Sequence, residues 1–364
     1  MNNNLLYIGG FEMPDGNAAA QRVLAIAKTL KDNYEIKFLG LTHSDNFKGT
    51  VCGFKYENLP YPHSRKEWVS HLRGTQELEY IKNNKPDVVI AYNYPAWALY
   101  RLIRYCKHIN IKIVGDITEW YYPHNILKWI DTEWRMRILN KKMDGLILIS
   151  RYLDEYYIDH NRIKVPPTID LSDAKWHVGD KKELSEKITL MYAGSPGRGD
   201  KDRLDNLIRV VGNFSNLTLN IVGVKKDTYM EQFPEIQIPE NVKFWGRLPH
   251  DTTISMLCES DFSIFFRQPS RVNNAGFPTK FVESQSAGIP VIANHFSDLD
   301  ESVEEGKNGY LAKSISLKDI KEVLEKVSTL DREQIGKMHE YTKAIQIFDY
   351  HKHKESLLKF MKEL

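Results

Sequence analysis

Residues 273–294, NNAGFPTKFVESQSAGIPVIAN, hold the strongest structural signal of the sequence. Pro278 suits the first turn of a helix, whereas Gly288 followed by Pro290 is typical of a helix end that leads into a strand. The spacing therefore predicts a short helix from about Pro278 to Ala287, followed by an apolar strand. A helix that connects two buried strands in this way is the building unit of a parallel α/β sheet.

The first turn of this predicted helix indicates an anion site. Lys280 lies there, where the helix macrodipole disfavours a cation, and a bound phosphate would remove the conflict. Thr279, Lys280 and Glu283 share one face because they are three and four residues apart. Glu283 is then placed one turn behind a phosphate, where its carboxylate can accept two neighbouring sugar hydroxyls. An ordinary exposed Lys–Glu pair is the alternative interpretation.

The same alternation of apolar strands and helical patterns runs along the chain, with one polar break up to Lys187. The predicted strands are 5–8, 36–39, 88–91, 111–114, 146–149, 188–193, 217–222, 242–245, 262–266 and 290–293. We therefore expect two doubly wound α/β domains, residues 1–170 and 171–345, facing a central cleft. Residues 346–364 read as a basic amphipathic helix that we expect to pack back on the first domain.

Composition limits the classes of function. The chain has 364 residues, enough for two domains, and 50 Lys and Arg against 48 Asp and Glu leave a net charge of only +2. This balance argues against a dedicated nucleic-acid binder. Three distant cysteines predict neither a disulfide frame nor a zinc site. No apolar run is long enough to span a membrane and no signal peptide is recognised, so we expect a cytoplasmic protein with at most peripheral membrane contact.

The segment that opens this section resembles glycosyltransferase family 4, whose members have the GT-B fold and retain anomeric configuration. The family motif is a Glu, seven residues, a second Glu, and then A-x-G-x-P-V-I-A. Glu283 and residues 286–293, SAGIPVIA, match its second half, and residues 277–283, FPTKFVE, resemble a branch with P-x-K-x-x-E. The first Glu is replaced by Ala275, so Asn273, Asn274 or the backbone near Gly276 would have to make its sugar contact.

The resemblance implies roles for named residues of both domains. In the loop YAGSPGRGDK, residues 192–201, it assigns Arg198 and Lys201 to the donor diphosphate, with Arg203 as a substitute for either. These cations would stabilise the charge that develops on the departing nucleoside diphosphate. The implied donor-binding residues are Gly16, Asn17, Gly194, Ser195, Arg247, Asn274, Gly276, Phe277, Pro278, Thr279, Lys280 and Glu283. A solvated charged loop is the alternative for the 192–201 segment.

The first domain supplies further candidates. Asp116, Glu119 and His124 follow a predicted strand at its carboxyl end, where functional side chains of α/β sheets gather, and we include them as catalytic candidates. The family has a His in this region that touches the donor sugar. We expect Arg22 to reach an anionic acceptor and Trp120 and Tyr121 to stack on an acceptor sugar; packing of these aromatic rings in the core is an equal alternative. Asn17 is a plausible N-cap for the first helix.

A mixture of aromatic and basic residues in the first domain permits contact with an anionic membrane. It is found in residues 129–142 and again in 97–112. The alternative, which we rank somewhat higher, is a helix that packs its aromatic side on the sheet.

The resemblance implies a metal-independent hexosyltransferase without cofactors. Its donor would be a nucleoside diphosphate sugar, with UDP favoured, and its acceptor a glycan or a lipid-linked glycan in cell-surface polysaccharide synthesis. Two other functions fit the same fold. One is a sugar-nucleotide 2-epimerase, and the other is a non-catalytic partner subunit, which Ala275 in place of Glu keeps open. A dehydrogenase is disfavoured because a G-x-G-x-x-G fingerprint is missing.

Overall fold

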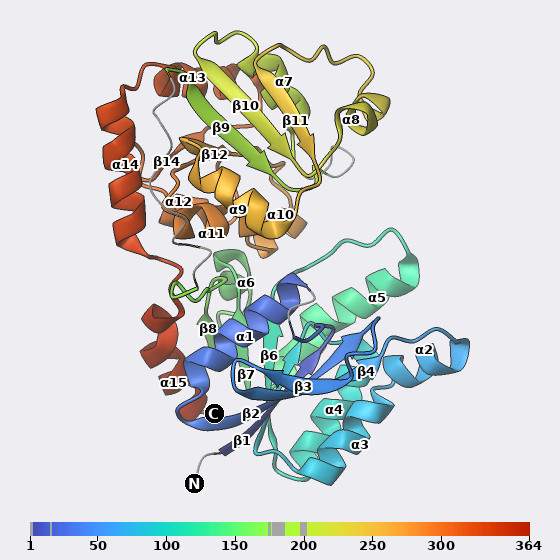
Figure 1. The fold of residues 1–364 in the computed structure, drawn as a ribbon. Coiled ribbons are helices and arrows are strands. Elements are labelled where there is room, and N and C mark those ends of the chain that lie inside the picture. Colours follow the sequence, from blue (N-terminus) through green and yellow to red (C-terminus); the bar gives the residue numbers. More distant parts are fainter. Residues whose placement is uncertain (1–2, 15–16, 174–175, 177–185, 197–201) are drawn as a thin grey trace. The chain divides into compact units, whose positions relative to one another are not determined.

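The computed structural model describes residues 3–14, 17–173, 176, 186–196 and 202–364 (Figure 1). The chain divides into two compact units, each with its own parallel sheet. Unit 1 consists of Met1–Ile169, Ala275–Phe277 and Tyr350–Leu364, and unit 2 of Asp170–Asn274 and Pro278–Asp349. Assignment of the short segment 275–277 to unit 1 has no counterpart in the sequence pattern.

Unit 1 contains an eight-stranded sheet in the order β3-β4-β2-β1-β5-β6-β7-β8. Its strands are β1 (Asn3–Gly9), β2 (Tyr34–Thr42), β3 (Lys48–Val51), β4 (Phe54–Pro60), β5 (Val88–Tyr92), β6 (Lys112–Ile117), β7 (Gly145–Leu148) and β8 (Arg162–Lys164). Neighbouring strands are parallel except for the antiparallel pair β3 and β4. The order reverses between β1 and β5, as in a doubly wound fold.

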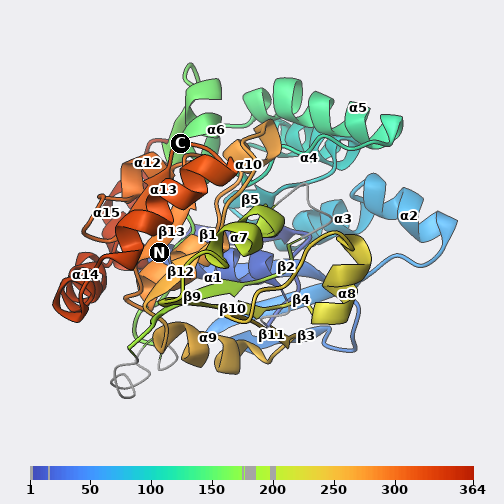
Figure 2. The same cartoon turned by 90° about the horizontal axis from the view of Figure 1, so that it is seen from above.

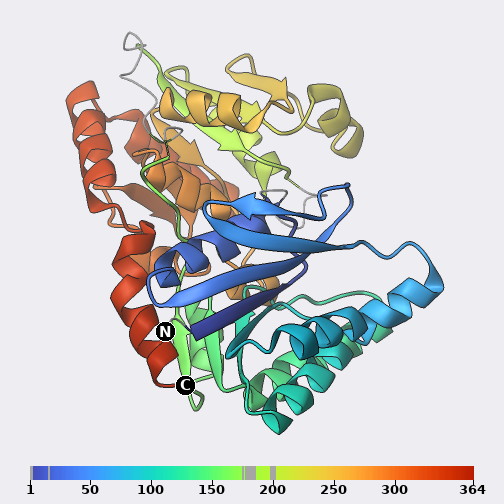
Figure 3. The ribbon, with the colours of Figure 1, turned by 60° about the horizontal axis from the view of Figure 1, so that its bottom comes forward.

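Helices cover both faces of this sheet, since alternate residues of β1 belong to two different apolar clusters. Leu5 and Tyr7 pack with α1 and α15, whereas Leu6 and Ile8 pack with α3 and α4. Figure 3 shows α1 and the red α15 on one side of the blue strands and the cyan helices on the other. The helical segments are α1 (Ala18–Leu30), α2 (Arg65–Leu72), α3 (Thr75–Asn84), α4 (Ala96–His108), α5 (Ile126–Trp134), η1 (Arg135–Leu139), η2 (Asn140–Lys142), α6 (Arg151–Tyr156), η4 (Tyr350–His353) and α15 (Lys354–Lys362).

Unit 2 contains a six-stranded parallel sheet in the order β11-β10-β9-β12-β13-β14. The strands are β9 (Ile188–Ala193), β10 (Leu217–Val222), β11 (Val242–Gly246), β12 (Phe262–Ile264), β13 (Val291–Asn294) and β14 (Gly309–Ala312). The helices are α7 (Leu204–Val211), α8 (Lys226–Gln232), α9 (His250–Cys258), α10 (Arg271–Ala275), α11 (Thr279–Ser286), α12 (Leu299–Ser302), α13 (Leu317–Ser328) and α14 (Arg332–Ile345). Figure 2 shows α7 and α13 on one face of the sheet and α9 on the other.

The predicted helix near Pro278 is confirmed as α11, with one difference at its start. Pro278 precedes the helix as its N-cap instead of occupying its first turn. At the other end Gly288 has a φ of +74°, the left-handed conformation that ends many helices. The capping role of Asn17 is also confirmed, because its side chain accepts a hydrogen bond from the backbone N–H of Ala20 at 2.9 Å.

Among the described residues, no helix combines the length and the apolar character needed to cross a membrane. In the same part of the chain, no group of three or more His, Cys, Asp or Glu side chains is arranged to hold a metal ion.

Candidate functional site

The carboxyl edge of the unit 2 sheet has little side-chain bulk where β9 and β10 end. Gly194 follows β9 and Gly223 follows β10, with φ of +129° and +115°, which favours glycine at both positions. A Cβ atom on Gly223 would lie 2.4 Å from the carbonyl oxygen of Gly194, so the two loops leave no room for a side chain. The strand order reverses between β9 and β12, and open parallel sheets bind ligands at such a point.

Lys280 reaches this edge from the first turn of α11. Its Nζ lies 3.8 Å from the centroid of the Tyr192 ring and pairs with the Asp202 carboxylate. A Cβ atom on Gly194 would lie 2.7 Å from Cε of Lys280, so the lysine side chain passes directly over this glycine. Lys280 and the glycine loop after β9 are therefore adjacent.

Asp202 joins the polar groups at this edge. Its carboxylate accepts hydrogen bonds from Nε of Arg267 and from the hydroxyl of Tyr192, each at 2.8 Å. Burial alone would raise the pKa of Asp202, but the charges of Lys280 and Arg267 outweigh it and lower this pKa. One carboxylate thus faces two cations, and the cluster carries a net positive charge that suits an anionic ligand.

Glu283 lies one turn behind Lys280 on α11, as the sequence predicts. Its carboxylate is partly exposed, and its Oε1 lies 3.6 Å from Nε2 of His250, the first residue of α9. A partly exposed carboxylate can accept two vicinal hydroxyls, so this position is compatible with ribose recognition. His250 follows the loop after β11 and adds a titratable group that the sequence analysis did not single out.

The structure locates most of the other expected donor residues of unit 2. Ser195, Arg247 and Thr279 are exposed and Pro278 is buried. The Asn274 side chain accepts a hydrogen bond from the backbone N–H of Ser297 at 3.1 Å. Their contacts with a donor remain predictions. Three expected residues, Gly16, Arg198 and Lys201, lie outside the described residues.

Ala275, at the position of the family's first Glu, belongs to an apolar cluster of unit 1. It is fully buried with Ile117, Trp120 and Met136, and Phe277 packs against the same cluster. The hydroxyl of Ser150 donates a hydrogen bond to the Ala275 carbonyl at 2.8 Å. A charged side chain at position 275 would have to enter this apolar cluster, which explains the small residue here. The segment 275–277, with Gly276 between, is thus held by unit 1.

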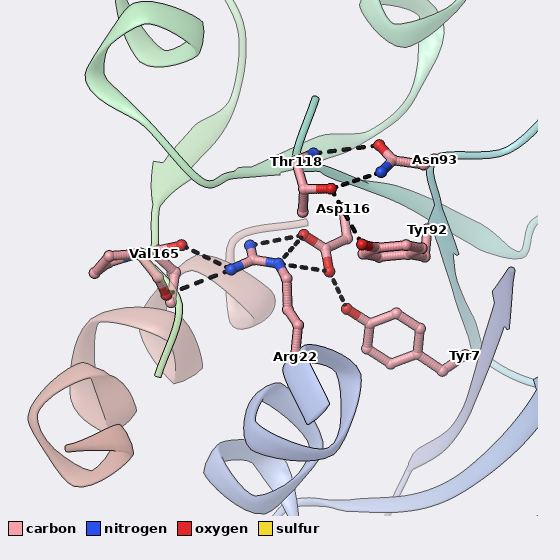
Figure 4. A network of polar contacts seen from close by, with 8 residues as sticks. Tyr7, Arg22, Tyr92, Asn93, Asp116, Thr118 and Val165 are labelled. Atoms are coloured by element: carbon pink, nitrogen blue, oxygen red, sulfur yellow. Dashed lines mark hydrogen bonds and ion pairs between the residues drawn. The ribbon is translucent and has the colours of Figure 1, made fainter. Parts of the chain in front are cut away.

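In unit 1, the expected substrate contacts of Asp116 and Arg22 require correction, because these two residues form a buried ion pair (Figure 4). Nη2 of Arg22 lies 2.8 Å from Oδ1 of Asp116, and the Tyr7 hydroxyl donates to Oδ2 at 2.6 Å. Arg22 also donates to the carbonyl of Val165 at 3.1 Å, which ties α1 to the segment after β8. Burial disfavours the charge of Arg22, but the Asp116 carboxylate outweighs it and raises the pKa of Arg22.

A second group of hydrogen bonds joins residues where β5 and β6 end (Figure 4). The Asn93 side-chain amide donates to the Thr118 hydroxyl at 2.6 Å, and the backbone N–H of Thr118 donates to Asn93 Oδ1 at 3.2 Å. The Thr118 hydroxyl in turn donates to the Tyr92 hydroxyl at 3.2 Å. These bonds fix the start of the loop that carries Glu119 and His124.

The aromatic residues of that loop have different environments. Trp120 is 2% exposed, packs edge-to-face on Tyr156 and donates from Nε1 to Glu133 at 3.1 Å. No face of its ring is left for an acceptor sugar, so packing in the core is the correct alternative. Tyr121 is 47% exposed, and burial of its hydroxyl end and the adjacent Glu119 raise its pKa. His124 is exposed, and the acceptor contact of Tyr121 stays a prediction.

The fold agrees with solved glycosyltransferase structures over the whole chain. Sucrose-phosphate synthase from Thermosynechococcus elongatus matches with a TM-score of 0.72 and 12% identity, over 100% of this chain and 99% of that one. HepE from Anabaena in complex with UDP-glucose matches with a TM-score of 0.68 and 16% identity, over 100% of both chains. The chain has the GT-B fold. At these identities the likeness shows the fold alone.

Two sequence comparisons bear on activity. Residues 180–345 match the family model described as glycosyl transferases group 1, and this range includes the Gly194 loop, Lys280 and Glu283. An uncharacterised 41.2 kDa protein in the cps region of Klebsiella pneumoniae is 29% identical over 301 residues, covering 77% of this chain and 78% of that protein. The GT-B fold and the group 1 match together support a glycosyltransferase.

Proposed function

We propose that this GT-B protein is a retaining glycosyltransferase of family 4 that transfers a hexose from a UDP-sugar to a glycan or lipid-linked acceptor in cell-surface polysaccharide synthesis. One observation carries the proposal: Lys280 crosses Gly194 at the point where the strand order of unit 2 reverses. Glu283 follows one turn later, and all three lie in the segment that matches the group 1 family model. UDP is favoured because the structurally similar HepE was solved with UDP-glucose.

The proposed reaction needs no nucleophile from the enzyme. The bond between the anomeric carbon and the phosphate oxygen breaks, and the acceptor oxygen forms a new bond on the same face. The acceptor hydroxyl proton passes to the departing phosphate oxygen. Lys280, with Arg198 and Lys201, would stabilise the negative charge that collects on the diphosphate. Neither a metal nor a cofactor takes part in this proposal.

Cell-surface polysaccharide synthesis is proposed because of the Klebsiella relative, which is described as lying in a cps region. A peripheral membrane contact fits the distribution of exposed apolar residues. Of the sixteen large apolar side chains that are exposed among the described residues, thirteen belong to unit 1. Those on α2, α4 and α5 are Trp68, Val69, Leu72, Trp97, Ile126, Leu127 and Ile130.

Helices α2, α4 and α5 lie next to one another and together carry a net positive charge. Gly74, after α2, faces Ala98 of α4, and the backbone N–H of Ala96 donates to Asp131 of α5 at 2.9 Å. Helix α2 has no buried residue, and α4 carries two Arg and one Lys but no acidic residue. Apolar side chains with cations beside them suit the surface of an anionic membrane. We propose that this surface holds unit 1 at a membrane that contains the acceptor.

Release of UDP from a panel of UDP-sugars, measured with and without acceptor, tests the transferase directly. Glu283→Ala should lose transfer and remain folded; full activity of this variant would overturn the site assignment. Mass spectrometry of the donor after incubation without acceptor distinguishes a 2-epimerase, which would convert the sugar itself. A thermal-shift screen over UDP, GDP, ADP and CMP with no response from any nucleotide would instead favour the non-catalytic partner subunit.

A further inference from the structure

Three arginines of the described residues are buried, and they differ in their partners. Arg22 and Arg267 are 6% and 7% exposed, and each pairs with a buried aspartate at 2.8 Å. Arg135 is equally buried at 7% exposure. Its Nε is buried with no hydrogen-bond partner among the described residues, and no carboxylate in that part of the chain forms an ion pair with it.

None of the described groups around Arg135 supplies the hydrogen bond or ion pair that its Nε lacks. The carboxylates of Asp131 and Glu119 favour its charged form without a hydrogen bond or an ion pair, and Tyr157 and Tyr121 also lie near it. The Asp131 carboxylate accepts a hydrogen bond from the backbone N–H of Ala96 at 2.9 Å. The Tyr157 hydroxyl donates to the Met136 carbonyl at 2.5 Å. Burial outweighs these neighbours and lowers the pKa of Arg135.

A buried guanidinium with no hydrogen-bonded or ion-paired carboxylate destabilises a fold, so proteins retain one mainly where it has a function. The backbone at this position is also unusual. Arg135 begins η1, a π-helical turn that continues α5, and such turns are frequent at functional sites. Two independent features, an unpaired buried cation and a π-helical turn, thus coincide at one residue.

We propose that Arg135 binds an anionic group with two or more oxygens, a phosphate or a carboxylate, on the acceptor. The planar guanidinium matches two oxygens of such a group at once. Glu119 and Tyr121, which lie near Arg135, belong to the loop after β6, at the carboxyl edge of the unit 1 sheet. Ligands of parallel sheets bind at that edge. The proposal rests on the proposed function only in naming the ligand as the acceptor.

The exposed side of α5 is consistent with an amphiphilic acceptor. Leu127 and Ile126, both a little more than two helical turns before Arg135, are 73% and 62% exposed. An acceptor phosphate attached to a lipid would place its charge at Arg135 and its chain beside these side chains. A uronic acid in a glycan acceptor would also present two anionic oxygens, but without an apolar chain. A lipid phosphate and an acidic sugar would therefore be recognised by the same chemistry.

The test uses thermal unfolding of the full chain with methyl phosphate or sodium galacturonate, at an ionic strength kept constant with chloride. Arg135→Met is compared with the wild type and with Lys31→Met, which removes an exposed cation of the same unit. Without anion, Arg135→Met should melt at or above the wild-type temperature, because an unpaired buried charge has gone. An anion at about a hundred times its Kd should raise the Tm of the wild type and of Lys31→Met by about 5–10 °C and leave Arg135→Met unchanged.

Either of the following results for Arg135→Met would overturn the proposal. A ligand-free Arg135→Met that melts well below the wild type, or does not fold, would make Arg135 a structural residue. An equal response of all three proteins would make the anion effect non-specific. Arg135→Lys keeps the charge without the fork of donors and should retain only part of the shift. A response to phosphate alone identifies a phosphorylated acceptor, and a response to galacturonate alone an acidic sugar.

The proposed transferase function is tested separately. If the wild type releases UDP from no UDP-sugar while Arg135 still determines the anion response, the function fails and the anion site stands. If UDP is released but no anion shifts the Tm, the anion site fails and the function stands.

Discussion

Asp202 offers the strongest quantitative prediction for the candidate donor site. Asp202→Asn preserves the shape of the side chain but removes the negative charge shared by Lys280 and Arg267. The carboxylate is 1% exposed and Arg267 is 7% exposed, so both cations would stay in or beside the protein interior with no counter-charge. Removal of one partner from a buried ion pair costs about 3–5 kcal/mol. For a unit of this size, that corresponds to a Tm lower by about 6–20 °C.

Scanning calorimetry measures this shift, with Asp227→Asn as the control because Asp227 is an exposed acidic residue of α8. UDP adds a second readout. A diphosphate beside Lys280 would supply the missing negative charge, so saturating UDP should raise the Tm of Asp202→Asn more than that of the wild type. A Tm of Asp202→Asn equal to that of Asp227→Asn would refute the assignment of Asp202 as the counter-charge of the cluster.

The pH dependence of the same variant follows from the lowered pKa of Asp202. The unfolded chain has the ordinary aspartate pKa of about 4, and the folded state has a lower one. The stability due to this ionised carboxylate is therefore fully present above pH about 4 and is lost as the pH falls through the folded-state pKa. The difference between the wild type and Asp202→Asn should be constant at neutral pH and shrink in acid.

Two further predictions concern unit 1. Asp116→Asn should lower the free energy of unfolding by about 3–5 kcal/mol, because Arg22 would remain buried without its partner. The double variant with Arg22→Met should recover part of this loss. Equal stability of the single variant and the wild type in urea unfolding would contradict the buried pair. Leu127→Glu on α5 should weaken binding to anionic vesicles by about tenfold or more in a sedimentation assay, given about 1.5–3 kcal/mol for burial of a leucine side chain. Leu317→Glu, at an exposed leucine of unit 2, is its matched control, and equal loss in both variants would remove the membrane surface from α5.

Much of the fold could be predicted because its strands are short apolar runs between turn residues. In β5, β7 and β13 nearly every residue is buried, so the sequence shows these strands as continuous apolar runs without reference to the rest of the chain. The hairpin of β3 and β4 was missed because Lys48–Val51 is an exposed edge strand with no apolar pattern. Edge strands are stabilised by pairing with a neighbour, which local sequence does not record.

The sequence predicts the relative position of candidate residues on one helix but not the contacts between distant segments. Lys280 and Glu283 lie on one face of α11, so their spacing in the sequence is sufficient to place them next to each other. Asp202 was missed because its partners Arg267 and Lys280 are 65 and 78 residues away in the chain. Arg22 and Asp116 were assigned to substrate for a related reason. A charge near the start of a helix and a carboxylate near the end of a strand look functional until their pairing across 94 residues is known.

Binding of UDP to the purified protein, measured by calorimetry for the wild type and for Glu283→Ala, tests the central claim most directly. We expect saturable binding of one nucleotide per chain and a Kd about tenfold to a hundredfold weaker in Glu283→Ala, since a charged hydrogen-bond acceptor is lost. Absence of binding for UDP, GDP, ADP and CMP, or an unchanged Kd in Glu283→Ala, would contradict a nucleotide-sugar site at the carboxyl edge of the unit 2 sheet.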